Sequence, residues 1–424
     1  MRRGAHISWS NTTSSSSGRE QLVQKTCLPC YHRPPVIRPA GLVLLFLAVP
    51  RLARADGPVT DRHYTIDAYR GAAVADYRVI GMGGASLATA EGAIGLLGNP
   101  AAAASRPATA SSWFYWDFLF DVYTPALAVD YDNSGTRQDQ AIGKTGALNA
   151  GLLGMFGVWG TAITVAGEVR NFTLPGGTEA TLSSAIWRLT LARSFADGEW
   201  IAGASLVGGG FNLRLPANGV DLVNATDWSI EAGGLWRPPE RNLRIGASFR
   251  PTMKPRIEGT ACDPNNCFGY ILPEHVEFPW NAGAGVAYHW GPTPWNRRIA
   301  EDFRDEKSVI LAGDVLVSGP VAGGSGLEAF LEKRLQRSGK NASVSPRVGA
   351  EYEWIPGWLR VRGGTYWEPA RFADVSGRLH VTLGLDVRFW SFSLWGTRYR
   401  LRFSLAGDGA RQYGNTALSL GFWH

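Results

Sequence analysis

Five arginines near the C-terminus are the residues of this 424-residue chain whose spacing most directly suggests binding chemistry. They recur at every second position in two stretches: Arg360, Arg362, Arg398, Arg400 and Arg402. A guanidinium group binds a carboxylate through two parallel hydrogen bonds, so a row of them on one strand face would hold the anionic head group of a ligand. The alternative is structural, because Glu351, Glu353 and Asp386 fall on the same predicted face and would pair with them.

The two cysteines that follow residue 55 point to a local cross-link. Cys262 and Cys267 enclose Asp-Pro-Asn-Asn, a sequence typical of turns. An even number of cysteines in an oxidising compartment favours a disulfide, so we expect this pair to clip an exposed loop. A metal site would need more ligands than the loop contains.

Enzyme motifs are missing from the sequence. Neither GxSxG nor HExxH occurs, and the cluster Gly81, Gly83 and Gly84 lacks the Gly-Lys-Ser/Thr of a phosphate-binding loop. The histidines after residue 55 suggest no third metal ligand. Only a Ser–His pair brought together in space would support a hydrolase. We therefore expect no enzyme, no cofactor and no metal.

Long β-strands must position these side chains. From about residue 111 onward, apolar and polar residues alternate, as in 379–389 and 398–405, and a period of two places them on opposite faces of a strand. Segments of about ten residues match the length of a tilted membrane-spanning strand. Turn sequences separate about 14 of them, within a range of 12–16. Part of 321–340 has helical spacing instead.

A sheet of this size must hide its edges, and closure into a barrel does so. Apolar side chains would face lipid, polar ones a wet lumen, and aromatic ones the two membrane interfaces. A secreted soluble sandwich or propeller is the alternative, but nothing repeats at the length of a propeller blade. We predict an all-β, transmembrane antiparallel barrel over residues 111–424.

The N-terminal leader explains the net charge of +6. Residues 1–55 hold eight basic residues and one acidic residue, which leaves 34 basic and 35 acidic residues in the remainder. The body is therefore almost neutral, which removes the electrostatic basis for binding nucleic acid. The apolar run at 40–49 is too short to span a membrane and fits a signal peptide with cleavage after Ala55.

Residues 56–110 are rich in glycine and alanine, do not alternate, and contain Gly81–Gly84 and Asn99-Pro100-Ala101 just before the first strand. This segment resembles the plug of the FadL-type outer-membrane transporters of hydrophobic compounds, and of the related family that includes the shuttle barrel of type IX secretion. The stretches 345–352 and 359–366 resemble paired strands of that family. The resemblance implies a 14-stranded barrel with a plug at 56–110. Gly81, Gly83, Gly84, Asn99, Pro100 and Ala101 would then either gate the channel or form ordinary close-packed turns.

The same resemblance implies a bacterial outer-membrane protein that passively transports hydrophobic, fatty-acid-like molecules. Its partners would be that ligand, outer-membrane lipid and the barrel-assembly machinery, which the alternating, aromatic-ended last strand at 417–424 would engage. The alternative function is a non-transporting barrel that tethers or hands over secreted or surface proteins.

Overall fold

The computed structural model describes residues 57–73, 76–110, 112–124, 130–135, 145–174, 177–215, 219–257, 262–299, 303–394 and 397–423. The expected leader, with its apolar run at 40–49 and cleavage after Ala55, lies outside these residues. None of the helices in the described part is long and apolar enough to cross a membrane.

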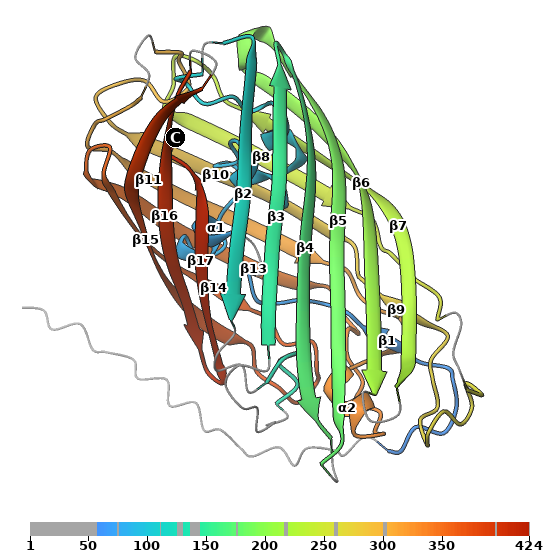
Figure 1. Ribbon diagram of the computed structural model, residues 1–424. Helices are drawn as coiled ribbons and strands as arrows, with labels where there is room; N and C mark the ends of the chain where they lie inside the picture. The colour runs from blue at the N-terminus through green and yellow to red at the C-terminus, as the bar shows by residue number, and fades with distance from the viewer. Residues whose placement is uncertain are drawn as a thin grey trace, which may run out of the picture. The chain divides into compact units, whose positions relative to one another are not determined.

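Fourteen antiparallel strands close into a barrel, as Figure 1 shows. β17 pairs with β2 and completes the ring, with Leu418 opposite Val122. This confirms the predicted all-β antiparallel barrel. The barrel strands in chain order are β2 (Phe114–Thr124), β3 (Thr145–Phe156), β4 (Trp159–Thr173), β5 (Glu179–Phe195), β6 (Trp200–Leu215), β7 (Val220–Trp236), β8 (Leu243–Arg250), β10 (Asn281–Trp290), β11 (Val309–Ser318), β13 (Ser343–Ile355), β14 (Leu359–Glu368), β15 (Arg378–Leu394), β16 (Thr397–Ala410) and β17 (Tyr413–Phe422).

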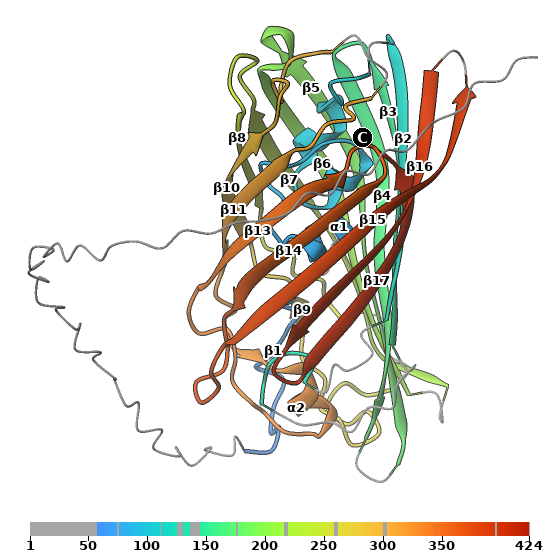
Figure 2. The ribbon, with the colours of Figure 1, turned by 90° about the vertical axis from the view of Figure 1, so that its left-hand side faces the viewer.

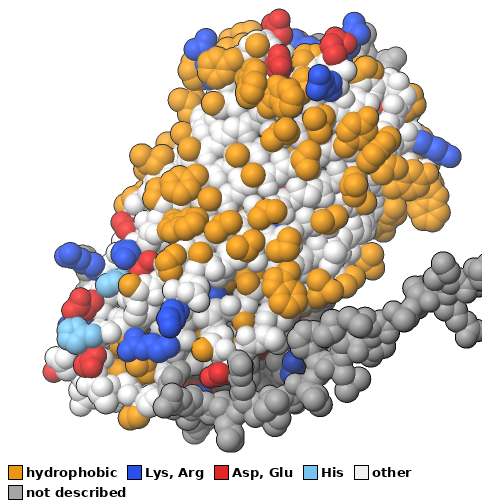
Figure 3. All heavy atoms as spheres, turned by 180° about the vertical axis from the view of Figure 1, so that it is seen from behind, with side chains coloured by type: hydrophobic (Ala, Val, Ile, Leu, Met, Phe, Trp, Pro, Cys, Tyr) orange, Lys and Arg blue, Asp and Glu red, His pale blue; other side chains and the backbone are white. Residues whose placement is uncertain are grey.

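The predicted alternation gives the barrel an apolar outer face. Along β15, Val381 and Leu383 are 60% and 68% exposed, whereas His380 and Thr382 are buried. Hydrophobic side chains cover the middle of the surface in Figure 3, and charged groups gather towards its two ends. Such a band is what a barrel presents to lipid, with aromatic residues at its borders. Exposed tryptophans include Trp159, Trp200, Trp228, Trp290, Trp354, Trp358, Trp367 and Trp390.

The two ends of the barrel differ in their connections. At the turn end, short links join β3 to β4, β5 to β6 through the 3-10 helix η3 (Ala196–Gly198), and β13 to β14, although 291–308 is longer. At the loop end, 251–280 and 319–342 are long. They contribute β9 (His275–Glu277) and β12 (Gly324–Ser325), which pair in parallel with the N-terminal β1 (Thr65–Asp67) between them.

The described residues of these loops, together with the start of the chain that the structure describes, form what we call the loop cap, residues 57–68, 130–135, 251–257, 262–280 and 319–338. The helix α2 (Leu327–Leu331) lies beside the three-stranded sheet, as the labels in Figure 2 show. Its Leu327, Phe330 and Leu331 belong to a buried cluster that continues onto the inner faces of β4 to β7. The cap therefore has its own hydrophobic core, and α2 accounts for the helical spacing noted in 321–340.

The segment before the first barrel strand lies inside the ring, where Figures 1 and 2 both place α1 (Tyr77–Gly81). The Asp76 carboxylate caps α1 by accepting the N–H groups of Arg78 and Val79. Two 3-10 helices follow, η1 (Ala93–Leu97) and η2 (Pro100–Ala104). The small alanines of η2 are buried, Ala101 to Ala103 completely, which allows this segment to lie close to the wall.

Candidate functional site

Two of the cavities that the described residues enclose in the lumen are lined by residues of α1. The loop-side cavity has a volume of about 200 Å³, and the turn-side cavity about 80 Å³. Arg78 lines the turn-side cavity and the next residue, Val79, lines the loop-side cavity. The short helix α1 is therefore the partition between them.

The loop-side cavity combines apolar walls with buried charges. Ile186 of β5, Leu316 of β11 and Phe278 of the loop cap supply apolar surface. Arg188 donates from Nε to Glu231 Oε2 at 2.7 Å, so one pair of these charges is neutralised. Such a cavity suits a molecule that is largely apolar and carries a small polar group. Its charged residues are Arg70, Arg188, Glu231, Arg250 and Arg347.

A smaller cavity of about 30 Å³ continues from the loop-side cavity and shares Arg70 with it. Glu168 pairs with Arg70 at 3.3 Å and accepts a hydrogen bond from the Tyr131 hydroxyl at 2.6 Å. Arg170 and Arg250 each have a buried Nε without a hydrogen-bond partner among the described residues. These donors are available to water or to the polar end of a ligand.

The turn-side cavity is lined by an ion-pair network. Arg362 donates to Asp386 from both terminal nitrogens at 2.6 Å and from Nε to Glu351 at 2.5 Å. Arg78 reaches Glu351 at 3.0 and 3.1 Å, and Arg360 reaches Glu353 at 2.9 Å. Arg360 and Arg362 thus contact the carboxylates named in the structural alternative, rather than an open binding surface.

The other three arginines lie along one face of β16 but differ in their surroundings. Arg400 pairs with Asp305, including a 2.7 Å contact from Nη2. Arg402 donates to the Phe422 carbonyl and to the Ser404 hydroxyl at 2.7 and 2.8 Å. Arg398 is exposed where β16 begins. Arg398 shares the strand face of the buried Arg400 and Arg402, so its exposure reflects its place at the end of the strand.

The glycine cluster lies where the inner segment approaches the wall most closely. Gly83 has a φ of +63°, and a side chain there would come within 2.5 Å of the Val348 carbonyl oxygen and the Thr365 nitrogen. Opposite it, a side chain on Gly364 of β14 would overlap the Gly83 backbone. Gly81 meets Gly384 of β15 in the same way, and Gly84 has a φ of +77°. Glycine is required here on both surfaces.

Asn99-Pro100-Ala101 attaches the same segment to strands β6 and β7. The completely buried Asn99 donates from Nδ2 to the Leu87 and Gly234 carbonyls at 3.1 and 3.0 Å, and its Oδ1 accepts the Ala101 N–H at 3.0 Å. Pro100 occupies the first turn of η2, where its missing N–H costs nothing. The contacts are those of a fixed turn bonded to the wall.

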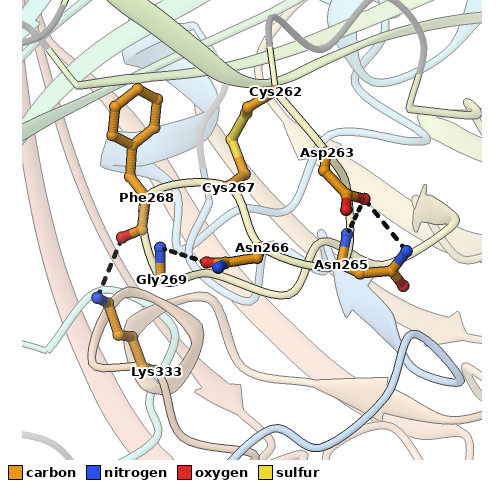
Figure 4. Close-up of a disulfide and its surroundings, with 8 residues drawn as sticks. All are labelled: Cys262, Asp263, Asn265, Asn266, Cys267, Phe268, Gly269 and Lys333. Atoms are coloured by element: carbon orange, nitrogen blue, oxygen red, sulfur yellow. Dashed lines mark hydrogen bonds between the residues drawn. A yellow bond between two sulfur atoms is a disulfide. The ribbon is translucent and has the colours of Figure 1, made fainter.

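The structure joins Cys262 and Cys267 in a disulfide within the loop cap, shown in Figure 4. Asp263 Oδ1 accepts the Asn265 N–H at 2.9 Å, which forms the turn between the cysteines. Lys333, just after α2, donates to the Phe268 carbonyl at 3.2 Å. The disulfide loop is thereby connected to the rest of the cap.

The sequence analysis did not single out the charged residues of the barrel strands that line the loop-side cavity or hold the inner segment. Arg188, Glu231 and Arg250 occupy inward positions of β5, β7 and β8, where the alternation would have revealed them. Asp314 of β11 accepts the Ser86 and Leu87 N–H groups at 2.6 and 3.0 Å. No local pattern marks such a contact.

Comparison with known proteins identifies the fold. No protein-family model and no curated protein matches the chain. A Pseudomonas aeruginosa FadL homologue aligns with a TM-score of 0.50 and 10% identity over 87% of this chain and 98% of that one. The P. putida toluene transporter TodX aligns with a TM-score of 0.51 and 12% identity over 84% and 98%. At this identity the similarity concerns architecture, and the chain has the fold of the FadL-type barrels.

Proposed function

We propose that the protein is an outer-membrane channel through which hydrophobic small molecules pass passively, with residues 57–110 acting as its plug. The observation that carries the proposal is the loop-side cavity, a partly apolar chamber next to α1 inside a barrel whose outer face is apolar. Two of the similar structures, both of TodX, are named a toluene transporter and a monoaromatic hydrocarbon channel, which supports this class of ligand.

The plug contacts favour a route that leaves most of the segment in place. Asn99, Gly83 and Asp314 attach it to the wall at separate points. The ladder between β7 and β8 is the shortest in the barrel, with five residue pairs, although β7 itself has 17 residues. Glu231 and Arg250 beside this ladder also line the loop-side cavity. We propose that a ligand leaves the cavity where β7 and β8 separate.

The test is uptake of radiolabelled toluene and of a labelled long-chain fatty acid by cells with and without the gene. We expect cells with the gene to take up at least one of the two compounds faster. Unlabelled polar solutes should not compete with this uptake. Mass spectrometry of the purified barrel should find a co-purified hydrophobic molecule. Equal uptake by both strains would contradict transport and favour the alternative, a barrel that tethers other proteins.

A further inference from the structure

Three carboxylates from two distant loops meet in the loop cap. Asp130 and Asp132 follow β2, and Glu328 lies in α2. One carboxylate oxygen of each lies within 4.8 Å of the others. Asp130 and Glu328 are buried and Asp132 is half-buried, so these are not acidic groups free in solvent.

The sequence around the two aspartates has the beginning of a calcium-binding loop. Asp130-Tyr-Asp-Asn-Ser-Gly135 matches the pattern D-x-[DN]-x-[DN]-G except at the fifth position, where Ser134 replaces Asp or Asn. Gly135 has a φ of +80°, as the sharp turn at this glycine requires. The two Asp130 oxygens accept the Ser134 and Gly135 N–H groups at 2.9 Å. In a calcium-binding loop of continuous sequence, the last ligand is a glutamate. Here Glu328, from another part of the chain, takes the place of that glutamate.

Glu328 accepts hydrogen bonds from the Tyr131 N–H and the Ser134 hydroxyl at 3.1 and 3.0 Å, but no cationic side chain of the described residues forms an ion pair with the three carboxylates. Arg378 contacts the loop, but it donates to the Asp130 backbone carbonyl at 3.1 Å and its carboxylate partner is Glu368. With their oxygens within 4.8 Å of one another, the three carboxylates repel one another when ionised.

Unused oxygen atoms at the cluster are a separate observation that points to a ligand. Asp132 Oδ1 is inaccessible to solvent and accepts no hydrogen bond from the described residues. Gln336 donates from Nε2 to the Ser134 carbonyl at 3.1 Å, which leaves its own Oε1 buried and without a partner there. A buried oxygen without a donor is costly unless a cation or water satisfies it.

We propose that Asp130, Asp132 and Glu328 bind a calcium ion, with Ser134 and water completing its oxygen ligands. Ca²⁺ accepts six to eight oxygen ligands in irregular geometry, whereas Mg²⁺ demands a tighter octahedron. The ion joins the β2–β3 connection to α2. Because α2 follows β12, which pairs with β1, the ion also strengthens the sheet that closes the loop end.

The experiment uses the full mature barrel in detergent, stripped with chelator, with Ca²⁺ or Mg²⁺ alone as the probe. Equilibrium dialysis should find one Ca²⁺ per chain with a dissociation constant at or below about 1 mM, the range of extracellular calcium modules. Thermal unfolding, followed by tryptophan fluorescence, should shift upwards with Ca²⁺ and far less with Mg²⁺. No uptake of Ca²⁺ and no shift at 5 mM, about five times that constant, would overturn the proposal.

Asp132→Asn and Glu328→Gln separate binding from damage to the fold, because they keep shape and remove charge. In chelator each variant should unfold at a higher temperature than the parent, since one repulsion is gone. In Ca²⁺ the order should reverse, because only the parent binds the ion. Asp374→Asn, an exposed aspartate of the β14–β15 connection, is the matched control and should respond like the parent. A lower unfolding temperature of both variants in chelator and in Ca²⁺ alike would contradict the proposal.

Discussion

Arg362 of β14 holds Asp386 of β15 through two parallel hydrogen bonds of 2.6 Å, and neither side chain is exposed to solvent. The same guanidinium donates to Glu351 on its other side. An arginine committed to two carboxylates contributes to the integrity of the barrel interior and has little capacity left for a ligand.

Arg362→Gln should therefore destabilise the barrel strongly. The substitution leaves Asp386 and Glu351 without their shared partner, and breaking a buried pair from one side costs about 3–5 kcal/mol. The free energy of unfolding in urea, measured on the refolded barrel, checks this. Arg398→Gln, at an exposed position, should stay within about 0.5 kcal/mol of the parent. Equal losses at both positions would contradict the distinction.

Gly364→Val should displace the inner segment. A side chain there overlaps the Gly83 backbone, and inserting bulk into a packed contact costs about 1–3 kcal/mol. Gly363→Val is the control, because its side chain would point outwards and meet nothing closer than 3.9 Å. Limited proteolysis should cleave the inner segment faster in Gly364→Val alone. Unchanged cleavage would show that the close contact is dispensable.

Ala166→Phe should block the loop-side cavity, which Ala166 lines from β4. If this cavity carries the ligand, uptake should fall about tenfold, equivalent to about 1.4 kcal/mol. Ala185→Phe places the same bulk on the outer face of β5 and should leave uptake unchanged. Unchanged uptake in the Ala166 variant would exclude this cavity from the route of the ligand. It would leave the proposal that the protein transports intact.

A cross-link between β7 and β8 should stop a ligand from leaving between them. Gly234 and Ala247 are cross-strand partners, so cysteines at both positions can form a disulfide. Uptake should fall on oxidation and recover on reduction. The pair Thr161 and Leu191, on β4 and β5, offers the same geometry away from the ladder and serves as the control. Equal uptake in both oxidised barrels would rule out this exit.

Stability of the metal-free cap should fall as pH rises from about 4 to about 6. The pKa of Asp130 is raised to about 6 by burial and Asp132, whereas the unfolded value is about 3.9. The folded state therefore binds the proton more tightly, and this stabilisation is lost above pH 6. Proteolysis of the cap loops at several pH values measures it. Ca²⁺ should remove most of the dependence of cap proteolysis on pH. The substitution Glu328→Gln should reduce this dependence in part. A flat profile in chelator would contradict the pKa shift.

The sequence by itself determined the faces of the strands and the class of fold. Side-chain direction alternates with every residue of an extended chain, so local pattern was enough to place Leu383 outside and Thr382 inside. Long alternating segments without intervening helices required closure, because an open edge in lipid leaves backbone groups unpaired. The count of about 14 strands followed from the turn sequences between them.

Only the tertiary structure decided which residues meet. Arg362 reaches Asp386 diagonally, because the register of the two strands places Gly384 opposite Arg362 and Asp386 opposite Arg360, and a shift of one residue would separate them. Asp132 and Glu328 lie almost 200 positions apart and belong to separate loops. The local sequence around one of them therefore does not predict that the other lies nearby. Gly83 reaches Gly364 because the inner segment threads a closed ring. Each contact depends on register, closure and loop packing, and those are properties of the whole chain.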